Sequence, residues 1–324
     1  MRSNILPLEY CDELVHLRAD VKPMPFSQVQ QVIEQEYGAS IQSIFSDIDP
    51  EPLGAASIAQ VHAATLKDKS RVVVKVQRPG IQETMSQDIT LMRKAVRILK
   101  AVSDLGDTLD FSAIIDEMWM VAQQEMNFLL EAEHMEEFSR LNREIEYVTC
   151  PKVDQSLTTS RVLVMEYVEG VQVDDLKALR QQGYDIKEIG VKLAENYCKQ
   201  VLDDAFFHAD PHPGNIWIRD GKIVWLDLGM MGRLTSRDKH LFRAAIRAVV
   251  NNDVYELKNI ILTLGVVKGR VNHTRLYTDL DDMVLKYGDM DLGSMNMGQM
   301  VQELLELAKN NGIGMPTGVT MLAR

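Results

Sequence analysis

The sequence predicts an α+β protein of two lobes, a small strand-rich lobe followed by a mainly helical one. Segments with strand character lie mainly between residues 55 and 168, whereas helical periodicity predominates after residue 169. Neither an internal repeat nor a Gly/Ser-rich linker is found, so we expect a short hinge at residues 166–170 to join the lobes. A ligand is expected in the cleft between them, with Glu166 and Val168 of the hinge as candidate ligand-binding residues.

Length and composition support this class. The chain has 324 residues, of which 46% are hydrophobic and 25% charged, enough to bury a core in each lobe. Its formal net charge of −12 argues against a nucleic-acid partner, because phosphate contacts need positive charge. Cys11, Cys150 and Cys198 form no CxxC pair, and no apolar run reaches the length of about 20 residues that spans a membrane. We therefore expect this chain to be soluble, in a reducing compartment.

Residues 1–50 are predicted to form a helical extension. Apolar residues at helical spacing lead to a break at Pro23 and Pro25, and a second helix follows with Ser27 as its cap. The first lobe, residues 51–168, is predicted to open with a β-hairpin. The other elements expected in this lobe are the hairpin strands around residues 58–61 and 71–76, helical stretches over 81–102 and 111–143, and a strand over 161–165.

The helix over residues 81–102 has a basic side that includes Arg93, Lys94 and Arg97. This side is either a solvated helix face, which is the commoner case, or a contact with an acidic lipid surface. The second lobe, residues 169–324, is predicted to be helical from Val173 to Phe207 and again beyond Ser236.

The segment of residues 208–229 carries the chemistry. It reads HADPHPGN, continues through a predicted hairpin and ends in DLG. Phosphoryl transfer needs one carboxylate near the attacking group and oxygen ligands for the metal that neutralises the phosphates. Asp210 fits the first role, and Asn215 and Asp227 fit the second.

The spacing HxDxxxxN matches the catalytic loop of protein kinases, and DLG stands where DFG is expected. Each half alone is a weak signal, but the two in order, with strands between them, are a strong one. The sequence thus predicts a protein-kinase-like fold that binds ATP (or ADP) and Mg²⁺.

Two other interpretations of these residues were considered. Asp227 and Asn215 are also typical of ordinary turns. His208, Asp210 and His212 alternate and are able to face one side of a strand as metal ligands, although two prolines interrupt any strand there. We interpret His208 as a structural histidine that braces the loop.

Lys75 lies in a valine-rich strand, where a buried ammonium group is unfavourable without an anionic partner. A nucleotide phosphate and a helical glutamate are the expected partners, and Glu131, within the apolar FLLEA, is the candidate glutamate. The alternatives are a lysine that extends to water and a solvated helix acid.

The turn before the first hairpin contains no GxGxxG. It carries Ala55, Ala56 and Ser57 where a glycine-rich loop would bring bare amides onto phosphates, and alanine disfavours positive φ. An APE-type segment after Asp227 is also missing. We expect phosphate handling that differs from that of ordinary protein kinases, without a standard platform for protein substrates.

These segments together resemble the UbiB family of atypical (ADCK-type) kinases, which is linked to ubiquinone and other isoprenoid-lipid biosynthesis. The segments that carry the resemblance are LPLEYCDELVHL, PLGAASIAQVH, VVVKVQRPGI, EMNFLLEA, LVMEYVEG, FHADPHPGN and WLDLGMMGRL. The resemblance implies catalytic roles for Asp210 and for an ion pair of Lys75 and Glu131. It further implies nucleotide contacts from Lys75 and the loop Ala55, Ala56 and Ser57, and magnesium ligands in Asn215 and Asp227.

This chain departs from the family pattern at three places. Glu125-Met126-Asn127 replaces the family's Glu-x-Asp, the upstream Lys-x-Gly-Gln motif is absent, and family members continue beyond MPTGVTMLAR, often into membrane helices. We therefore expect a fragment. The resemblance implies that the full protein associates with the cytoplasmic face of a membrane through segments absent from this chain, with lipid or quinone-pathway proteins as partners.

Three functions fit the sequence. The first is an ATP-dependent phosphotransferase or ATPase that supports ubiquinone or related lipid biosynthesis, and the second is a non-catalytic ATP-gated scaffold for a lipid biosynthetic complex. The third, a small-molecule phosphotransferase of the aminoglycoside or choline type, ranks last, because residues before 140 fit the atypical-kinase pattern better.

Overall fold

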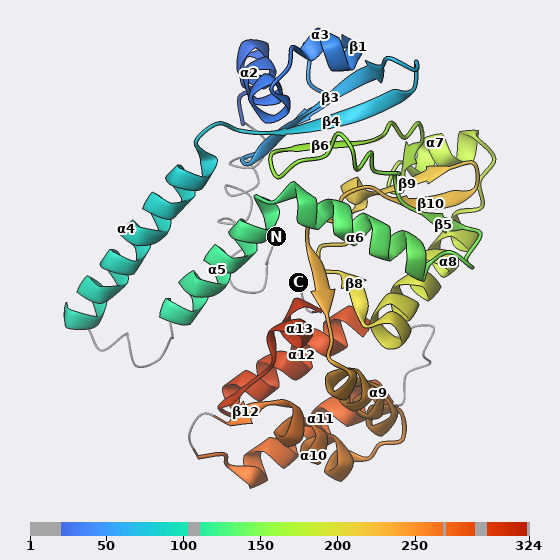
Figure 1. Cartoon of the computed structure of the whole chain (residues 1–324). Coiled ribbons are helices and arrows are strands. Elements are labelled where there is room, and N and C mark those ends of the chain that lie inside the picture. The colour runs from blue at the N-terminus through green and yellow to red at the C-terminus, as the bar shows by residue number, and fades with distance from the viewer. Residues whose placement is uncertain (1–20, 103–110, 268–269, 289–296, 323–324) are drawn as a thin grey trace. The chain divides into compact units, whose positions relative to one another are not determined.

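The computed structural model describes residues 21–102, 111–267, 270–288 and 297–322 (Figure 1). Two compact units make up the chain: Met1–Tyr184 with His212–Met230, and Asp185–Pro211 with Met231–Arg324. The lobe boundaries predicted at residues 50/51 and 168/169 are a different division of the chain and stay a prediction. The helix expected before Pro23 and the LPLEYCDELVHL segment lie mostly outside the described residues.

A five-stranded antiparallel sheet forms the centre of the first unit. Its order is β1-β3-β4-β6, with β2 paired to β3. The predicted hairpin is confirmed as β3 and β4, and the polar turn between them includes Lys69 with a φ of 73°. The last part of the predicted helical extension, residues 1–50, contains the strand β1, which forms one edge of this sheet. The strands are β1 (Phe45–Ile48), β2 (Gly54–Ala55), β3 (Ala59–Leu66), β4 (Arg71–Gln77) and β6 (Val162–Glu166).

Successive side chains of β4 alternate between the two faces of the sheet. Val72, Val74 and Val76 pack in one hydrophobic cluster with the helix α2 (Phe26–Tyr37). Because successive strand residues point to opposite faces, Lys75 is directed to the other face of the sheet. The short helix α3 (Ile41–Ile44) follows α2. Pro25, not Ser27, precedes the first residue of α2, so the predicted serine cap is wrong; proline's fixed φ suits it to a helix start.

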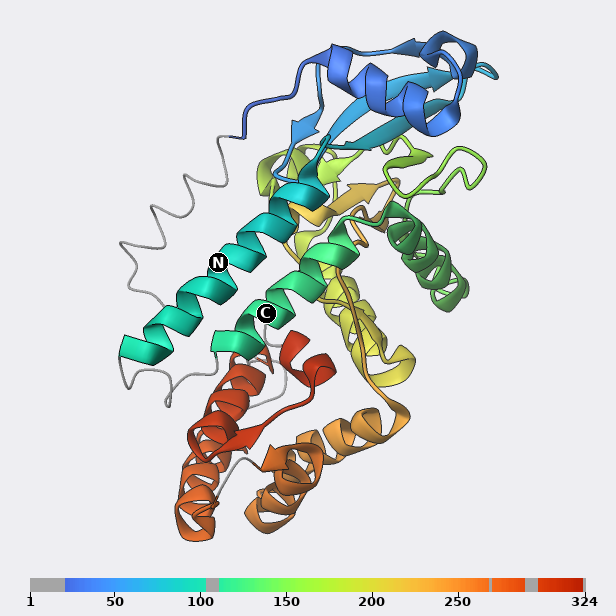
Figure 2. The same cartoon turned by 60° about the vertical axis from the view of Figure 1, so that its left-hand side comes forward.

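Among the described residues, three helices lie between β4 and β6 in the chain. The first two, α4 (Ile81–Val102) and α5 (Phe111–Glu125), lie side by side (Figure 2) and share a small core around Ile89, Val96 and Ile115. The helical stretch predicted over 111–143 is divided, because Asn127 caps a new helix, α6 (Phe128–Leu141), by accepting a hydrogen bond from the Leu129 N–H at 3.2 Å.

A four-stranded sheet completes the first unit, in the order β5-β10-β9-β7. The hairpin predicted after the HADPHPGN segment is confirmed as β9 and β10. Its turn residues Asp220 and Gly221 have φ angles of 50° and 74°, as a two-residue hairpin turn requires. The strands are β5 (Val148–Thr149), β7 (Val171–Gln172), β9 (Ile216–Arg219) and β10 (Lys222–Trp225), and the helix α7 (Leu176–Gln181) follows β7.

The second unit is mainly helical, as predicted. Its helix α8 (Ile186–Lys199) continues into a π-helical turn, Gln200–Asp204, before β8 (Phe206–His208) pairs with β11 (Met231–Arg233). Within the described part of the chain, no helix is both long and apolar enough to span a bilayer. The remaining elements are α9 (Ser236–Val250), α10 (Val254–Leu264), β12 (Val266–Val267), α11 (His273–Gly288), α12 (Met297–Asn310), β13 (Ile313–Gly314) and α13 (Thr317–Met321).

Candidate functional site

Lys75 and Glu131 form the predicted ion pair. The Lys75 Nζ lies 2.9 Å from Oε2 and 3.1 Å from Oε1 of Glu131. Because Asn127 starts α6, Glu131 lies in the first turn of this helix, next to the buried Phe128 and Ala132. The two side chains are 17% and 4% exposed, so the pair is largely removed from water.

Asp227 adds a second carboxylate to Lys75. It follows β10, and its Oδ2 lies 3.5 Å from the Lys75 Nζ, while its Oδ1 accepts a hydrogen bond from the Gly229 N–H at 2.9 Å. A side chain at Gly229 would come within 3.1 Å of the Asp227 Oδ1, so glycine permits this close approach. Asp227 is 46% exposed and keeps part of its surface open to a ligand.

Charge and burial act in opposite directions on this cluster. Burial by itself lowers the pKa of Lys75, but the carboxylates of Asp227 and Glu131 outweigh it and hold that pKa above its ordinary value. Burial raises the pKa of Glu131 to about 7, against the opposing effect of Lys75 and with the charge of Asp227 adding to the rise. Lys75 is thus a permanent cation, whereas Glu131 titrates near neutral pH.

Asn215 is brought next to Asp227 by the β9–β10 hairpin. Ile216 pairs with Trp225, and the Asn215 carbonyl accepts a hydrogen bond from the Leu226 N–H at 2.9 Å. Leu226 directly precedes Asp227, so the two predicted magnesium ligands lie at the same end of the hairpin.

The donor set fits a magnesium ion that is bound together with a nucleotide. Among the residues described, no group of three or more His, Cys, Asp or Glu side chains is placed to hold a metal by itself. Magnesium at nucleotide sites takes one or two protein oxygens and completes its shell with phosphate and water. The Asp227 carboxylate and the Asn215 amide oxygen are ligands of this kind.

Asp210 belongs to the second unit, where it follows β8. Its N–H donates to the Nδ1 of His208 at 3.1 Å, so His208 braces the loop as expected. The Nδ1 of His212 likewise accepts the Gly214 N–H, at 3.0 Å. Because Nδ1 accepts a backbone N–H in both histidines, Nε2 carries the proton of the neutral ring and offers no lone pair to a metal, which argues further against the metal-site interpretation.

The Ala-rich loop is closed by its own backbone. Ala55 pairs with Gln60, and the Ala56 N–H donates to the Ala59 carbonyl at 2.8 Å. None of Ala55, Ala56 and Ser57 adopts a positive φ, as their sequence predicts. Arg78 holds the loop from outside, because its Nε donates to the Ala56 carbonyl at 2.8 Å while its Nη2 donates to the Lys22 carbonyl at 2.9 Å.

The hinge residues have protein partners of their own. The Glu166 carboxylate accepts from the Arg219 Nη1 at 2.7 Å and from the Lys152 N–H at 3.2 Å. Val168 is 9% exposed. Both of these Glu166 contacts lie outside the Lys75 cluster, and the role of Glu166 and Val168 in nucleotide binding stays a prediction.

Sequence reasoning missed three buried polar residues. His134, one turn after Glu131 on α6, donates from Nδ1 to the Leu228 carbonyl at 2.8 Å and so supports the DLG turn. Gln60, 0% exposed, accepts the Met24 N–H at 2.8 Å and lies 3.0 Å from the Nε2 of His62. The Nδ1 of His62 donates to the Asp49 carbonyl at 2.7 Å. The spacing of His134 from Glu131 was the one available signal.

Comparison with known proteins shows which family this chain resembles. The family model described as the ABC1 atypical kinase-like domain matches residues 16–261. An uncharacterised protein in the hydrogenase 1 5′ region of Clostridium pasteurianum is 38% identical over 324 residues, which are 100% of this chain and 61% of that protein. The probable protein kinase UbiB of Shewanella woodyi is 31% identical over 314 residues, 95% of this chain and 57% of that protein. The chain thus spans about three fifths of these relatives.

A solved structure supports the fold. The complex of Rv3197 with erythromycin from Mycobacterium tuberculosis matches with a TM-score of 0.65 and 24% identity, over 89% of this chain and 72% of that one. Together with the family match, this likeness confirms the predicted α+β, protein-kinase-like fold.

Proposed function

Since the chain belongs to the ABC1 atypical kinase-like family, which includes the UbiB proteins, we propose that it binds ATP with Mg²⁺ and transfers or hydrolyses the terminal phosphoryl group. The observation that carries this proposal is the cluster in which Lys75 lies 2.9 Å from Glu131 and 3.5 Å from Asp227. A cation held between a buried and a half-exposed carboxylate, beside an asparagine, is the constellation that phosphate and magnesium binding require.

Each residue has a distinct role in this proposal. Lys75 contacts a phosphate oxygen, and Glu131 fixes the position of its ammonium group. Asp227 and Asn215 hold the magnesium ion, which neutralises phosphate charge when bound. Asp210 takes the proton of the attacking hydroxyl or water. The oxygen of that hydroxyl or water bonds to the terminal phosphorus while the bond from this phosphorus to the bridging oxygen breaks, and ADP leaves.

Family membership supports a proposal for the acceptor class. We propose that the acceptor lies in ubiquinone or related isoprenoid-lipid biosynthesis, either a lipid or a protein of that pathway. We further propose that the whole protein works at the cytoplasmic face of a membrane. An assay that includes anionic vesicles and isoprenoid precursors tests both points, and turnover unaffected by either addition would contradict them.

A second candidate function is an ATP-gated scaffold without turnover. It is favoured by the Ala-rich loop, where the Ala56 N–H donates to the Ala59 carbonyl and is committed within the loop. A glycine-rich loop instead directs such amides at the phosphates. Tight binding of ATP with magnesium, but no phosphate release under any lipid condition, would favour the scaffold over the enzyme.

The test combines calorimetric binding of ATP, with and without Mg²⁺, and phosphate release by matched variants. Lys75→Met is expected to weaken ATP binding about tenfold, from the loss of one charged phosphate contact. Asp227→Asn is expected to abolish the magnesium-dependent part of the affinity and the turnover. Asp88→Asn, an exposed carboxylate on α4 of the same unit, is the control and should behave as wild type. Equal rates in wild type, Lys75→Met and Asp227→Asn would refute the proposed enzyme.

A further inference from the structure

Three polar side chains are buried in the second unit near the HADPHPGN segment, and two of them, Asn196 and Gln200, have no role in the site described so far. Asn196 and Gln200 are 0% exposed and His208 is 1% exposed. They lie where α8 widens into the π-helical turn Gln200–Asp204, which ends at Ala205 with a φ of 55°. π-Helical turns are rare, and those that occur are found frequently at functional sites. A positive φ is likewise uncommon for alanine.

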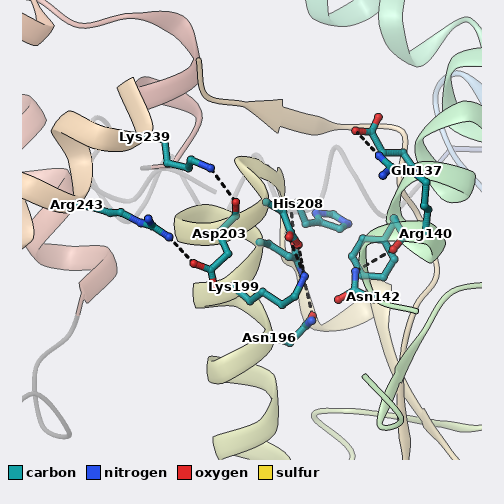
Figure 3. Close-up of polar contacts among 12 residues, drawn as sticks. Glu137, Arg140, Asn142, Asn196, Lys199, Asp203, His208, Lys239 and Arg243 are labelled. Atoms are coloured by element: carbon teal, nitrogen blue, oxygen red, sulfur yellow. Dashed lines mark hydrogen bonds and ion pairs between the residues drawn. The ribbon is translucent and has the colours of Figure 1, made fainter. Parts of the chain in front are cut away.

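The turn is anchored from outside. Figure 3 shows Lys239 and Arg243 of α9 reaching Asp203, where the Lys239 Nζ donates to the Asp203 carbonyl at 2.9 Å and Arg243 pairs with the carboxylate. Lys199 binds both oxygens of Asp204, at 2.7 and 2.8 Å. These contacts fix the turn, and with it the side chain at its first residue.

Gln200 holds the backbone that leads into the HADPHPGN segment. Its Oε1 accepts the His208 N–H at 3.0 Å, and its Nε2 donates to the Asn196 Oδ1 at 2.8 Å. Tyr197, on the same helix, donates from its hydroxyl to the His208 carbonyl at 3.1 Å. The peptide groups on both sides of His208 are thus bound by side chains of α8 and the turn.

His208 passes this constraint to Asp210. The His208 Nδ1 accepts the Asp210 N–H at 3.1 Å, so this nitrogen carries no proton. A chain of hydrogen bonds therefore runs from Asn196 through Gln200 and His208 to the backbone of Asp210.

We propose that Gln200 is a positioning residue for Asp210 and acts through His208. The inference rests on the proposed function, in which Asp210 is the base. A glutamine is suited to the task because its amide accepts one hydrogen bond and donates another. Leucine at this position offers neither, and glutamate keeps only the acceptor for the His208 N–H. Because a misplaced base slows chemistry more than substrate binding, the effect belongs to kcat rather than to KM.

The first measurement is independent of activity. In ¹⁵N-labelled protein, Gln200→Leu is expected to speed hydrogen exchange of the Asp210 N–H at least about tenfold and to move the ¹⁵N shift of the His208 Nδ1. Gln200→Glu should leave both near wild type. Asn311→Leu is the matched control, since Asn311 is a buried amide of the same unit, 7% exposed, that bonds to Asp279 and not to the catalytic loop.

The second measurement is kinetic. Gln200→Leu should lower kcat between about tenfold and a hundredfold, with KM for ATP within about twofold of wild type, and Gln200→Glu should recover most of the rate. In an Asp210→Asn background, Gln200→Leu should have no further effect, because it acts only through Asp210. A general loss of structure would instead lower the rate in both backgrounds.

Unchanged exchange of the Asp210 N–H in Gln200→Leu would overturn the proposal, as would equal rate losses with and without Asp210. If wild type shows no turnover, the proposed function fails, while the exchange and shift measurements still decide whether Gln200 positions Asp210. Should Gln200→Leu not fold, Gln200→Asn, which keeps the amide but is one methylene shorter, provides the same comparison.

Discussion

Replacing Lys75 with methionine isolates the charge balance of the Lys75–Glu131–Asp227 cluster. Methionine retains the length of the side chain and removes the ammonium group. Glu131 is then left 3% exposed, beside a second carboxylate and without a cation. A buried carboxylate in this situation stays protonated, with a pKa that reaches about 8–9 in documented cases.

The size of the effect depends on pH. In wild type the pKa of Glu131 is raised from 4.5 to about 7, so the native state holds this proton more tightly than the unfolded chain. The stability contributed by this group is therefore full below pH 4.5, falls as pH rises to about 7 and is level above it. In Lys75→Met the stability contribution of Glu131 continues to fall until the pH reaches the higher pKa that Glu131 has in this variant, at about 1.4 kcal/mol for each pH unit. The variant should lose about 2 kcal/mol relative to wild type between pH 6 and pH 9.

The assay is urea unfolding followed by tryptophan fluorescence at pH 6, 7, 8 and 9. The chain has three tryptophans, and Trp119, Trp217 and Trp225 all belong to the first unit, so the signal reports the unit that contains the cluster. Glu131→Gln removes the titrating group and is the matched control. The double variant Lys75→Met/Glu131→Gln should show no pH-dependent difference from Glu131→Gln alone.

Two results would refute this reasoning. One is a stability difference between wild type and Lys75→Met that is the same at pH 6 and pH 9. The other is a pH-dependent difference that persists in the Glu131→Gln background, which would assign the titration to a group other than Glu131.

Three further variants test contacts around the cluster. Arg78→Ala removes the bonds to the Ala56 and Lys22 carbonyls and should weaken ATP binding about threefold to tenfold through a looser loop; calorimetry with unchanged affinity would contradict this. His134→Ala leaves the Leu228 carbonyl without this donor and should lower the free energy of unfolding by about 1–3 kcal/mol, against less than about 0.5 kcal/mol for an exposed alanine substitution on α6. Asn127→Ala should cost about 1 kcal/mol through loss of the helix cap while Asn127→Asp should be near neutral, and equal urea midpoints for both would show that the cap is unimportant.

The sequence was informative where a charge stands in an apolar pattern. Lys75 was found because an ammonium group among valines needs an anion, and the two-residue alternation of β4 explains why it is directed away from α2. Asp227 and Asn215 were found because the HxDxxxxN and DLG patterns follow each other with a recognisable hairpin, a polar turn between two apolar runs, between them. In both cases the feature that completes the prediction, an acidic side chain for Lys75 and a hairpin for Asn215 and Asp227, has a recognisable sequence pattern.

Local errors had a similarly simple cause. Ser27 is a good capping residue, but Pro25 precedes the helix and places its start two residues earlier. The division between α5 and α6 was missed because the apolar pattern continues across it, whereas the cap at Asn127 depends on one side chain accepting a backbone N–H.

The buried neutral residues were missed for a more general reason. His134, Gln60, His62 and Gln200 each bond to a backbone group, which in some cases lies far along the chain, as with Leu228, 94 positions after His134. A backbone carbonyl or amide is the same at every position, so no residue type at the other end marks the contact. Gln60 and His62, from the PLGAASIAQVH segment that carries the family resemblance, form hydrogen bonds inside the first unit. The residues that carry the family resemblance and the candidate site residues therefore overlap only in part, and burial with hydrogen-bond partners is what separates them.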